Sequence, residues 1–519
     1  MKALLLAALA AGPAPWAPRA HAASGGGSVK LIAYDRRGRP MNLAQLLAFI
    51  GRADKKPPLD PRDSGLAVSS PEGSGLAKPR LRQSGGLVVL EWDRLPRIQL
   101  SLPWPVAADG FSTVWADKNG EGFADGDAVF LNEEIALTQY RLFEEDLQRR
   151  SGQGSPPYQA GPQGRKLTEK ARQSLSEARE SRSAAKRAAA FDAALQAVSL
   201  AWERALFEHG RELARGPGEP PPRFGLSLDE SLLERPRELE WLAAAVRDSG
   251  ANWARLVFRS NPRDFAYSEA GSFKEYDAAV SQLRKAGLRI MGCVLDAPQR
   301  PGGLTPAAYA ARTKNLILHY KGLIASWEIA SDLNGDWPGG LSPGKAFAIY
   351  AAAAAQAKKT DPSVETVASL RWWDGTAPDA EHALFGWLSR RVPQGFGRDL
   401  DVVAVILDPE DDPVGLAFAT IFERVHRALP GKRLMLGSIG YVEKKDLKGY
   451  WWLDPFETGK AREDLATLYT AAACAVPRSL CGGFWRRTLE DMLPAKGKKT
   501  GLYKAYQSAL RGLVRPSSI

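Results

Sequence analysis

Two aspartates stand where a side chain could move a proton. Asp332 follows the letters WEIAS, and Asp408 follows the letters VVAVIL, so each comes directly after a short apolar run. A pair of carboxyl groups can act as general acid and general base on one bond when their spacing suits the reaction. Asp332 and Asp408 are therefore candidates for proton transfer.

Aromatic residues cluster after the same kind of run. The sequence holds 15 tryptophans, and indole faces stack well on the C–H face of a sugar ring. Any single tryptophan is equally at home in a protein core, but the group predicts a glycan-binding rim. Its members, together with one tyrosine, are Trp337, Trp372, Trp373, Tyr441 and Trp485.

The elements that position these residues repeat between 222 and 513. Eight short apolar runs alternate with amphipathic helical segments, which is the pattern of a (β/α)8 TIM barrel of the α/β class. An open doubly wound sheet is the alternative, but no glycine-rich nucleotide or phosphate loop follows any run. The runs are 224–228, 253–258, 289–295, 324–329, 366–370, 402–407, 433–436 and 481–484.

Motifs at the strand ends carry a family resemblance. The second run contains W-x-R ending at Arg255, and the fourth reads YKGLIASWEI with Asn334 six residues after the glutamate. A G-S-I-G segment follows the seventh run, and the eighth ends in Trp485. Residues 222–513 thus resemble the large glycoside hydrolase clan whose barrels carry catalytic glutamates after strands four and seven. The resemblance implies a polysaccharide or oligosaccharide ligand and no cofactor.

Both catalytic positions of that clan are substituted in this chain. Ser331-Asp332 stands where the resemblance places Asn-Glu, and Gly437-Ser438 stands where it places Thr-Glu. Asp332 is then the candidate acid/base and Ser438 occupies the nucleophile position without a carboxylate, so the retaining mechanism is predicted to be lost. Asp408 is the candidate second carboxylate, and an inverting route needs it about 6.5–9.5 Å from Asp332.

The resemblance also assigns binding roles. It makes Arg255, Asn334 and the aromatic rim substrate-binding, and it predicts that Arg255, Asp332 and Ser438 converge in one cleft. Once buried, Arg255 needs a partner for its charge, and the candidates are Asp332, Asp408 and a ligand uronate. Glu328 is expected to be an internal hydrogen-bonded residue below the site.

Two functions remain open at this point. One is an exported glycoside-hydrolase-like barrel that processes a polysaccharide. The other is a non-catalytic pseudoenzyme that kept the cleft and binds a glycan or a partner. A Ser–His hydrolase is not supported, because no histidine lies near Ser438 in the sequence.

The segments before the barrel divide into three. Residues 1–22 predict a signal peptide, 28–150 a small α+β or sandwich-like accessory domain, and 151–221 a linker with a long helical stretch. Oxygen side chains at Asp117, Asn119 and Glu121 match the first positions of a calcium loop, but the twelfth position is Ala128. A Gly/Asp-rich turn is the alternative to calcium there.

Charge and cysteines indicate the compartment and partners. The net charge of +11 is spread along the 519 residues, so no nucleic-acid partner is expected, and no run is long enough for a membrane span. The leader predicts a secreted or periplasmic protein. There, a Cys474–Cys481 disulfide with Cys293 left buried is one reading, and three unpaired core thiols are the other.

Overall fold

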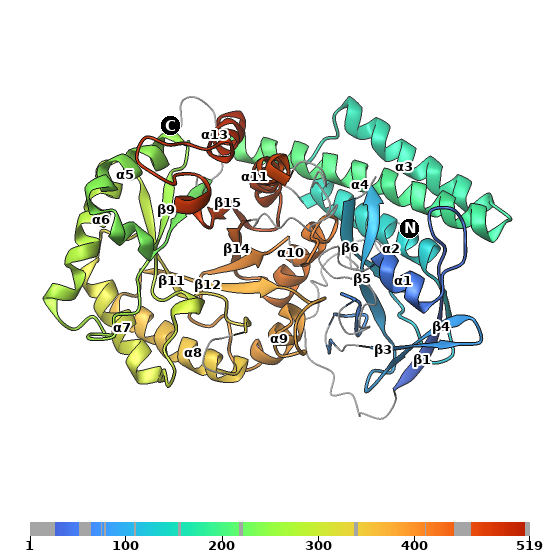
Figure 1. Cartoon of the computed structure of the whole chain (residues 1–519), viewed down its shortest axis with the longest axis horizontal. Coiled ribbons are helices and arrows are strands. Elements are labelled where there is room, and N and C mark those ends of the chain that lie inside the picture. The colour runs from blue at the N-terminus through green and yellow to red at the C-terminus, as the bar shows by residue number, and fades with distance from the viewer. Residues whose placement is uncertain are drawn as a thin grey trace, which may run out of the picture.

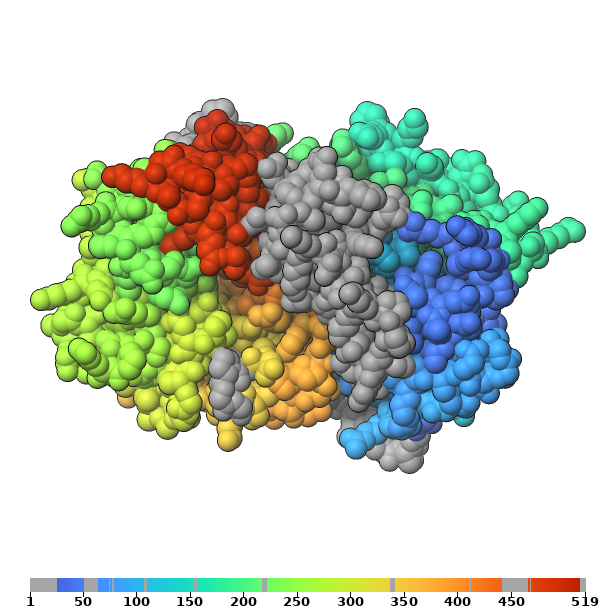
Figure 2. All heavy atoms as spheres, in the orientation of Figure 1, coloured from blue at the N-terminus to red at the C-terminus, as the bar shows by residue number. Residues whose placement is uncertain are grey.

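The chain folds into two adjoining units, shown as ribbons in Figure 1 and as the two lobes of the space-filling view in Figure 2. This computed structural model describes residues 26–50, 64–73, 75–76, 79–107, 110–153, 157–216, 222–336, 341–409, 412–440 and 458–513. The predicted signal peptide, Trp337 and Tyr441 lie outside the described residues.

The C-terminal unit is a closed barrel of eight parallel strands, which confirms the fold predicted from the alternating runs. The strands follow one another around the barrel in chain order, and β15 pairs with β8 to close it. All eight predicted runs contribute a strand. The strands are β8 (Gly225–Leu228), β9 (Trp253–Val257), β10 (Arg289–Cys293), β11 (Ser326–Ala330), β12 (Glu365–Trp372), β13 (Val402–Leu407), β14 (Arg433–Ile439) and β15 (Ser479–Trp485).

Helices surround the barrel between successive strands. Two begin with the same local device, a hydroxyl N-cap followed by proline: Thr305 accepts from the Ala308 amide, and Ser342 from the Lys345 amide. The helices are α5 (Leu239–Asp248), α6 (Lys274–Lys285), α7 (Pro306–His319), α8 (Pro343–Thr360), α9 (Leu384–Arg391), α10 (Ala417–Ala428), α11 (Thr458–Cys474), α12 (Thr488–Asp491) and α13 (Gly501–Leu513).

Apolar side chains fill the lower interior of the barrel. Alternate strand residues point inward, and the inward ones form a buried cluster that includes Trp253, Met291, Ala404, Met435 and Phe484. The residues between them pack outward against the helices in a separate, larger cluster. The interior below the strand ends is therefore a packed core, and any site must lie above it.

The N-terminal unit is α+β. It has a four-stranded sheet in the order β3-β4-β1-β7 and a three-stranded sheet in the order β2-β5-β6. Its elements are β1 (Gly27–Ile32), α1 (Leu43–Ile50), β2 (Ala67–Ser69), β3 (Arg80–Ser84), β4 (Leu87–Trp92), β5 (Gln99–Ala107), β6 (Gly110–Ala116), β7 (Ala128–Phe130) and α2 (Leu131–Gln153).

The predicted long helical stretch is a hairpin of two helices, α3 (Pro162–Glu180) and α4 (Ala184–Arg215). Buried residues such as Phe191, Leu195 and Trp202 place α4 in the core of the N-terminal unit. Figure 1 shows α4 running along the top of the molecule from that unit toward α11 and α13. The helix thus supports both units.

The two units meet through direct hydrogen bonds. The Thr113 amide of β6 donates to the Pro413 carbonyl at 2.8 Å, and the Ser112 hydroxyl accepts from the Leu416 amide at 2.8 Å.

In the described part of the chain, no helix combines the length and apolar character that crossing a membrane requires.

Candidate functional site

Polar side chains replace the apolar filling one layer higher in the barrel. The Arg255 Nε donates to Glu328 Oε2 at 2.6 Å, and the Ser369 hydroxyl donates to Glu328 Oε1 at 2.5 Å. Arg255 and Glu328 are both buried. Glu328 therefore neutralises Arg255, and the candidates Asp332 and Asp408 were wrong for this role. Glu328 itself is the internal hydrogen-bonded residue that the sequence predicted.

A second carboxylate, Asp296, also contacts Arg255, and sequence reasoning missed it. Asp296 Oδ1 accepts from the Ser331 hydroxyl at 2.5 Å and from Arg255 Nη2 at 3.3 Å. Burial raises the pKa of Asp296, but the charge of Arg255 and the hydrogen bonds from Ser331 and the Ala297 amide outweigh it, so the net pKa shift is downward. Asp296 therefore favours the ionised form. Its position just after β10 was the available signal.

Arg371, at the end of β12, joins the two candidate acid/base residues. Its Nη2 and Nε donate to Asp332 Oδ2 at 2.6 and 3.1 Å, and its Nη1 donates to Asp408 Oδ2. Arg486, after β15, forms an ion pair with the other oxygen of Asp408. One guanidinium thus lies between the two aspartates, and a second holds Asp408 from the other side.

The cations of this network are more exposed than its anions. The side chains of Asp332 and Asp408 are 9% and 4% exposed, whereas those of Arg371 and Arg486 are 27% and 25% exposed. Among the four side chains of this network, the two guanidiniums are therefore the more accessible to solvent and to a ligand that enters from it.

The backbone at Asp332 has an unusual conformation. Its φ is +54°, in the left-handed region that non-glycine residues adopt rarely, and its carbonyl accepts from the Gly335 amide at 3.2 Å. A Cβ atom at Gly335 would lie 2.5 Å from Asp332 Oδ2, so a larger residue at 335 would displace this carboxylate. Within the described part of the chain, Asp332 Oδ1 is buried without a hydrogen-bond partner.

Asn334, a predicted substrate-binding residue, makes its described hydrogen bonds to the backbone of the protein. Its amide nitrogen donates to the carbonyls of Arg371 at 2.8 Å and His382 at 2.6 Å, and its oxygen accepts from the Arg371 amide at 2.7 Å. Both amide hydrogens are therefore used inside the protein, and Asn334 is fully buried. It holds the loop after β11 against the end of β12.

Two members of the predicted aromatic rim are buried away from the barrel interior. Trp372 and Trp485 are each 1% exposed and belong to the cluster between the barrel and its helices. Because residues alternate along a strand, the inward position of Arg371 turns its neighbour Trp372 outward. Trp373 is half-buried, its indole nitrogen donates to the His382 carbonyl at 2.7 Å, and its ring centroid lies 5.8 Å from the Arg371 guanidinium.

Strand register gives the position of Ser438. Ala404 and Met435 are paired and both point inward; the register then shifts, so that Ile406 pairs with Ser438 and Gly437 forms a bulge. Arg371 is the next partner of Ile406, on β12. Ser438 is therefore in phase with the inward residues, two strand spacings, or about 10 Å, from Arg371.

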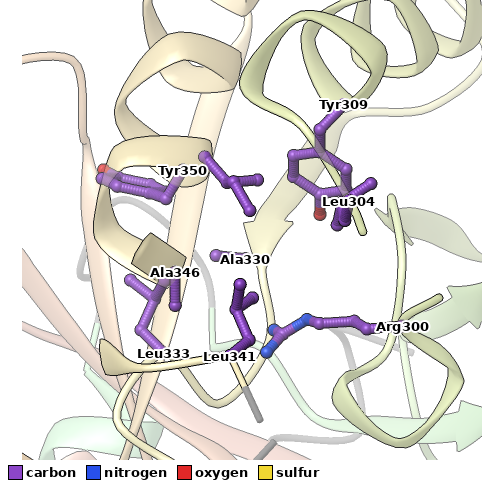
Figure 3. A pocket seen from close by; sticks show the side chains of 9 residues that line it. Arg300, Leu304, Tyr309, Ala330, Leu333, Leu341, Ala346 and Tyr350 are labelled. Carbon is purple, nitrogen blue, oxygen red and sulfur yellow. The ribbon is translucent and has the colours of Figure 1, made fainter. Parts of the chain in front are cut away.

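A small pocket lies beside the barrel wall, between β11 and the helices α7 and α8 (Figure 3). Arg300, Tyr309, Ala330, Leu341 and Tyr350 are among its lining residues. Its volume is about 10 Å³, the room that one water molecule needs. Burial lowers the pKa of Arg300 to about 9 against the opposing charges of Asp332 and Asp296. This pocket is too small for a sugar ring.

The calcium-loop residues are not arranged as a ligand set. Asp117 accepts from the Gly120 amide at 3.0 Å and the Thr138 hydroxyl at 3.1 Å, and its other oxygen pairs with Arg141. Asp117 therefore serves protein donors. Among the residues that the structure describes, no group of three or more His, Cys, Asp or Glu could hold a metal ion.

Comparisons with known proteins give structural matches alone. No protein-family model matches the chain, and no curated protein matches it. Solved structures of glycoside hydrolases are similar to it over part of its length. A family 1 β-glucosidase from Thermotoga maritima is 9% identical with a TM-score of 0.42, over 58% of this chain and 100% of that chain.

Two further glycoside hydrolases are similar at the same level. A GH53 catalytic domain from Ignisphaera aggregans is 15% identical with a TM-score of 0.40, over 58% of this chain and 99% of that chain. A GH10 endoxylanase retrieved from a sugarcane soil metagenome is 17% identical with a TM-score of 0.39, over 55% of this chain and 97% of that chain.

Proposed function

We propose that this chain is an exported glycan-binding barrel of the glycoside hydrolase type that does not use the retaining mechanism. The observation that carries the proposal is the guanidinium of Arg371 between Asp332 and Asp408. A hydrolytic pair needs open space between its carboxyl groups for the scissile bond, and for a water in the inverting case. Here an arginine fills that space, and Ser438 supplies no carboxylate.

Binding without turnover is the expected result. The purified chain should bind at least one polysaccharide of a broad panel in affinity electrophoresis, and no new reducing ends should form during long incubation. Release of reducing ends that the Asp332→Asn variant abolishes would contradict the proposal.

Hydrolysis by an inverting route is the second candidate, and one atom favours it. Asp332 Oδ1 is buried and without a hydrogen-bond partner among the described residues, so it is an acceptor that a ligand hydroxyl could use if the site opened. In that case Arg371 must move when the ligand binds. Turnover with inversion at the anomeric carbon, followed by proton NMR, would select this candidate.

Export is the second part of the proposal. The predicted leader supports it, and so does the bond between Cys474 and Cys481, because disulfides persist in oxidising compartments. Cys293 is a free buried thiol. Mass spectrometry of the protein from the extracellular or periplasmic fraction should give a mature N-terminus at Ala23 and an intact Cys474–Cys481 pair.

A further inference from the structure

At the strand ends the positive charges are more exposed than the negative ones, and this difference bears on whether the ligand is an acidic or a neutral glycan. Asp408 is buried, and the two guanidiniums that hold its two oxygens, those of Arg371 and Arg486, are each about one quarter exposed. Asp332, the other anion bound to Arg371, is buried as well. A neutral sugar hydroxyl can pair with either charge, whereas a ligand carboxylate is favoured only where cations face it.

Asp408 also fixes how the cations sit relative to each other. Because each guanidinium pairs with a different oxygen of one carboxylate, the two are held side by side. Arginine is planar and presents parallel N–H groups that match the two oxygens of a carboxylate. The pair is therefore organised for an anion before any ligand arrives.

An aromatic face adjoins the same cations. Trp373 is half-buried, and its indole nitrogen is fixed by the His382 carbonyl. Its ring lies 5.8 Å from the Arg371 guanidinium. A sugar ring that stacks on this indole would have its substituents within reach of Arg371.

We propose that the glycan is acidic, and that Arg371 and Arg486 bind the carboxylate of a uronate residue while Trp373 contacts its ring. This inference rests on the proposed function and names the substrate class of the same site. A uronate carboxylate is planar with two oxygens, as the arginine fork requires.

The test compares each polymer with its own neutral form. The full-length protein is titrated with polygalacturonate, alginate and glucuronan, and with the same three polymers after chemical reduction of their carboxyl groups. At least one acidic polymer should bind at least tenfold more tightly than its reduced form. Its affinity should fall as the salt concentration rises, because exposed charges are screened.

A variant pair locates the binding to the site. Arg486→Gln should weaken the acidic polymer by about tenfold, as expected for one charge-assisted hydrogen bond. Arg433→Gln is the control: Arg433 is also partly exposed and ion-paired, but its partner Glu365 begins β12 at the opposite end of the barrel. Arg433→Gln should leave the affinity for the acidic polymer unchanged. Circular dichroism and thermal unfolding must show both variants folded.

The outcomes distinguish a failure of the acidic-ligand proposal from a failure of the glycan-binding proposal on which it rests. Equal or tighter binding of the reduced polymers would overturn the acidic ligand and leave a glycan-binding barrel. Equal losses of affinity in the Arg486→Gln and Arg433→Gln variants would also overturn the acidic-ligand proposal. Binding of no glycan, acidic or neutral, would overturn both proposals.

Discussion

Arg371 has a different role from every site residue that the motifs assigned. It bonds to Asp332, which follows β11, and to Asp408, which follows β13, so its charge is shared by the loops on both sides of β12. Removing this shared cation leaves two buried carboxylates close together, which is costly because Asp332 then loses its guanidinium partner and Asp408 keeps only Arg486. The arginine is therefore a structural requirement of the site as well as its proposed contact to ligand.

This sharing predicts a compensating pair of substitutions. Arg371→Gln should lower the free energy of unfolding at pH 7 by about 3 kcal/mol, measured by urea unfolding. Adding Asp332→Asn should recover part of the loss, because only one buried carboxylate then remains. A double variant that loses the sum of the two single effects would contradict the shared ion pair.

Asp374 makes the stability of the protein depend on pH. It is buried, and its Oδ1 accepts from the Leu384 amide at the start of α9 at 2.8 Å. Burial raises its pKa to about 7, and the Leu384 amide and the charge of Arg424 oppose this only in part. The folded protein thus holds a proton that the unfolded chain releases near pH 4, so this group makes stability fall as the pH rises from about 4 to 7.

Asp374→Asn should remove that pH dependence while keeping the hydrogen bond to Leu384. Relative to wild type, the variant should gain about 3 kcal/mol of unfolding free energy between pH 5 and pH 8, measured by urea unfolding at both values. Asp379→Asn is the matched control. The pKa of Asp379 is lowered, by hydrogen bonds from His382 and Glu381 that outweigh burial, so Asp379 is ionised at both pH values. If the difference in unfolding free energy between Asp374→Asn and wild type were the same at pH 5 and pH 8, the raised pKa of Asp374 would be contradicted.

At the scale of elements, the geometry of β14 determines the direction in which the side chain at position 438 points. The bulge at Gly437 brings Ser438 into phase with Ile406 and hence with the interior. An ideal Cβ at Gly437 would lie 2.7 Å from the Ala404 side chain, so this part of the bulge favours glycine. The strand thus retains an inward side chain at 438 while its chemistry has changed.

A carboxylate at 438 is therefore expected to be insufficient for hydrolysis. Ser438→Glu should fold and show no turnover of aryl glycosides, because Asp332 and Asp408 remain bonded to Arg371. Thermal unfolding and a chromogenic assay check the two halves of this prediction. Turnover by the single variant would show that Asp332 can donate a proton despite its ion pair, and would revive the retaining mechanism.

At the scale of the whole molecule, α10 joins the two units. Arg424 on this helix bonds to Gln99 of β5 at 3.0 Å, and its guanidinium lies 4.9 Å from the ring centroid of Trp115 on β6. Leu416 and Ala419 of the barrel belong to the core of the N-terminal unit. The N-terminal unit is therefore packed on the loops that follow β12 and β13, close to the candidate site.

The contact between α10 and the N-terminal unit predicts that one side chain, Arg424, contributes strongly to the free energy of unfolding. Arg424→Ala should lower the unfolding free energy by about 2–4 kcal/mol, because it removes ring contacts and leaves polar partners without a donor. Arg427→Ala is the control on the same helix: Arg427 is exposed and pairs only with Glu423 in the described contacts, so a change under about 0.5 kcal/mol is expected. Equal effects in urea unfolding would contradict the role of Arg424.

Much of the barrel was determined locally, and this is why the sequence predicted it. Eight apolar runs became eight strands, and Asp332, Arg371 and Asp408 fell at strand ends because chain order fixes which residue follows a run. Alternation along β12 would also have turned Trp372 outward once Arg371 was known to face inward. Motif spacing alone does not include that alternation, so it overestimated the aromatic rim.

The partners of each site residue were decided by the tertiary structure alone. Arg255 lies 73 residues from Glu328, and Arg371 lies 37 residues from Asp408 and 39 from Asp332. Closing the barrel brings such distant residues onto neighbouring strands, about 4.8 Å apart, and side-chain length and burial then select which charges pair. The sequence by itself determined a barrel with acids and bases at its strand ends; the fold decided that an arginine separates the two acids.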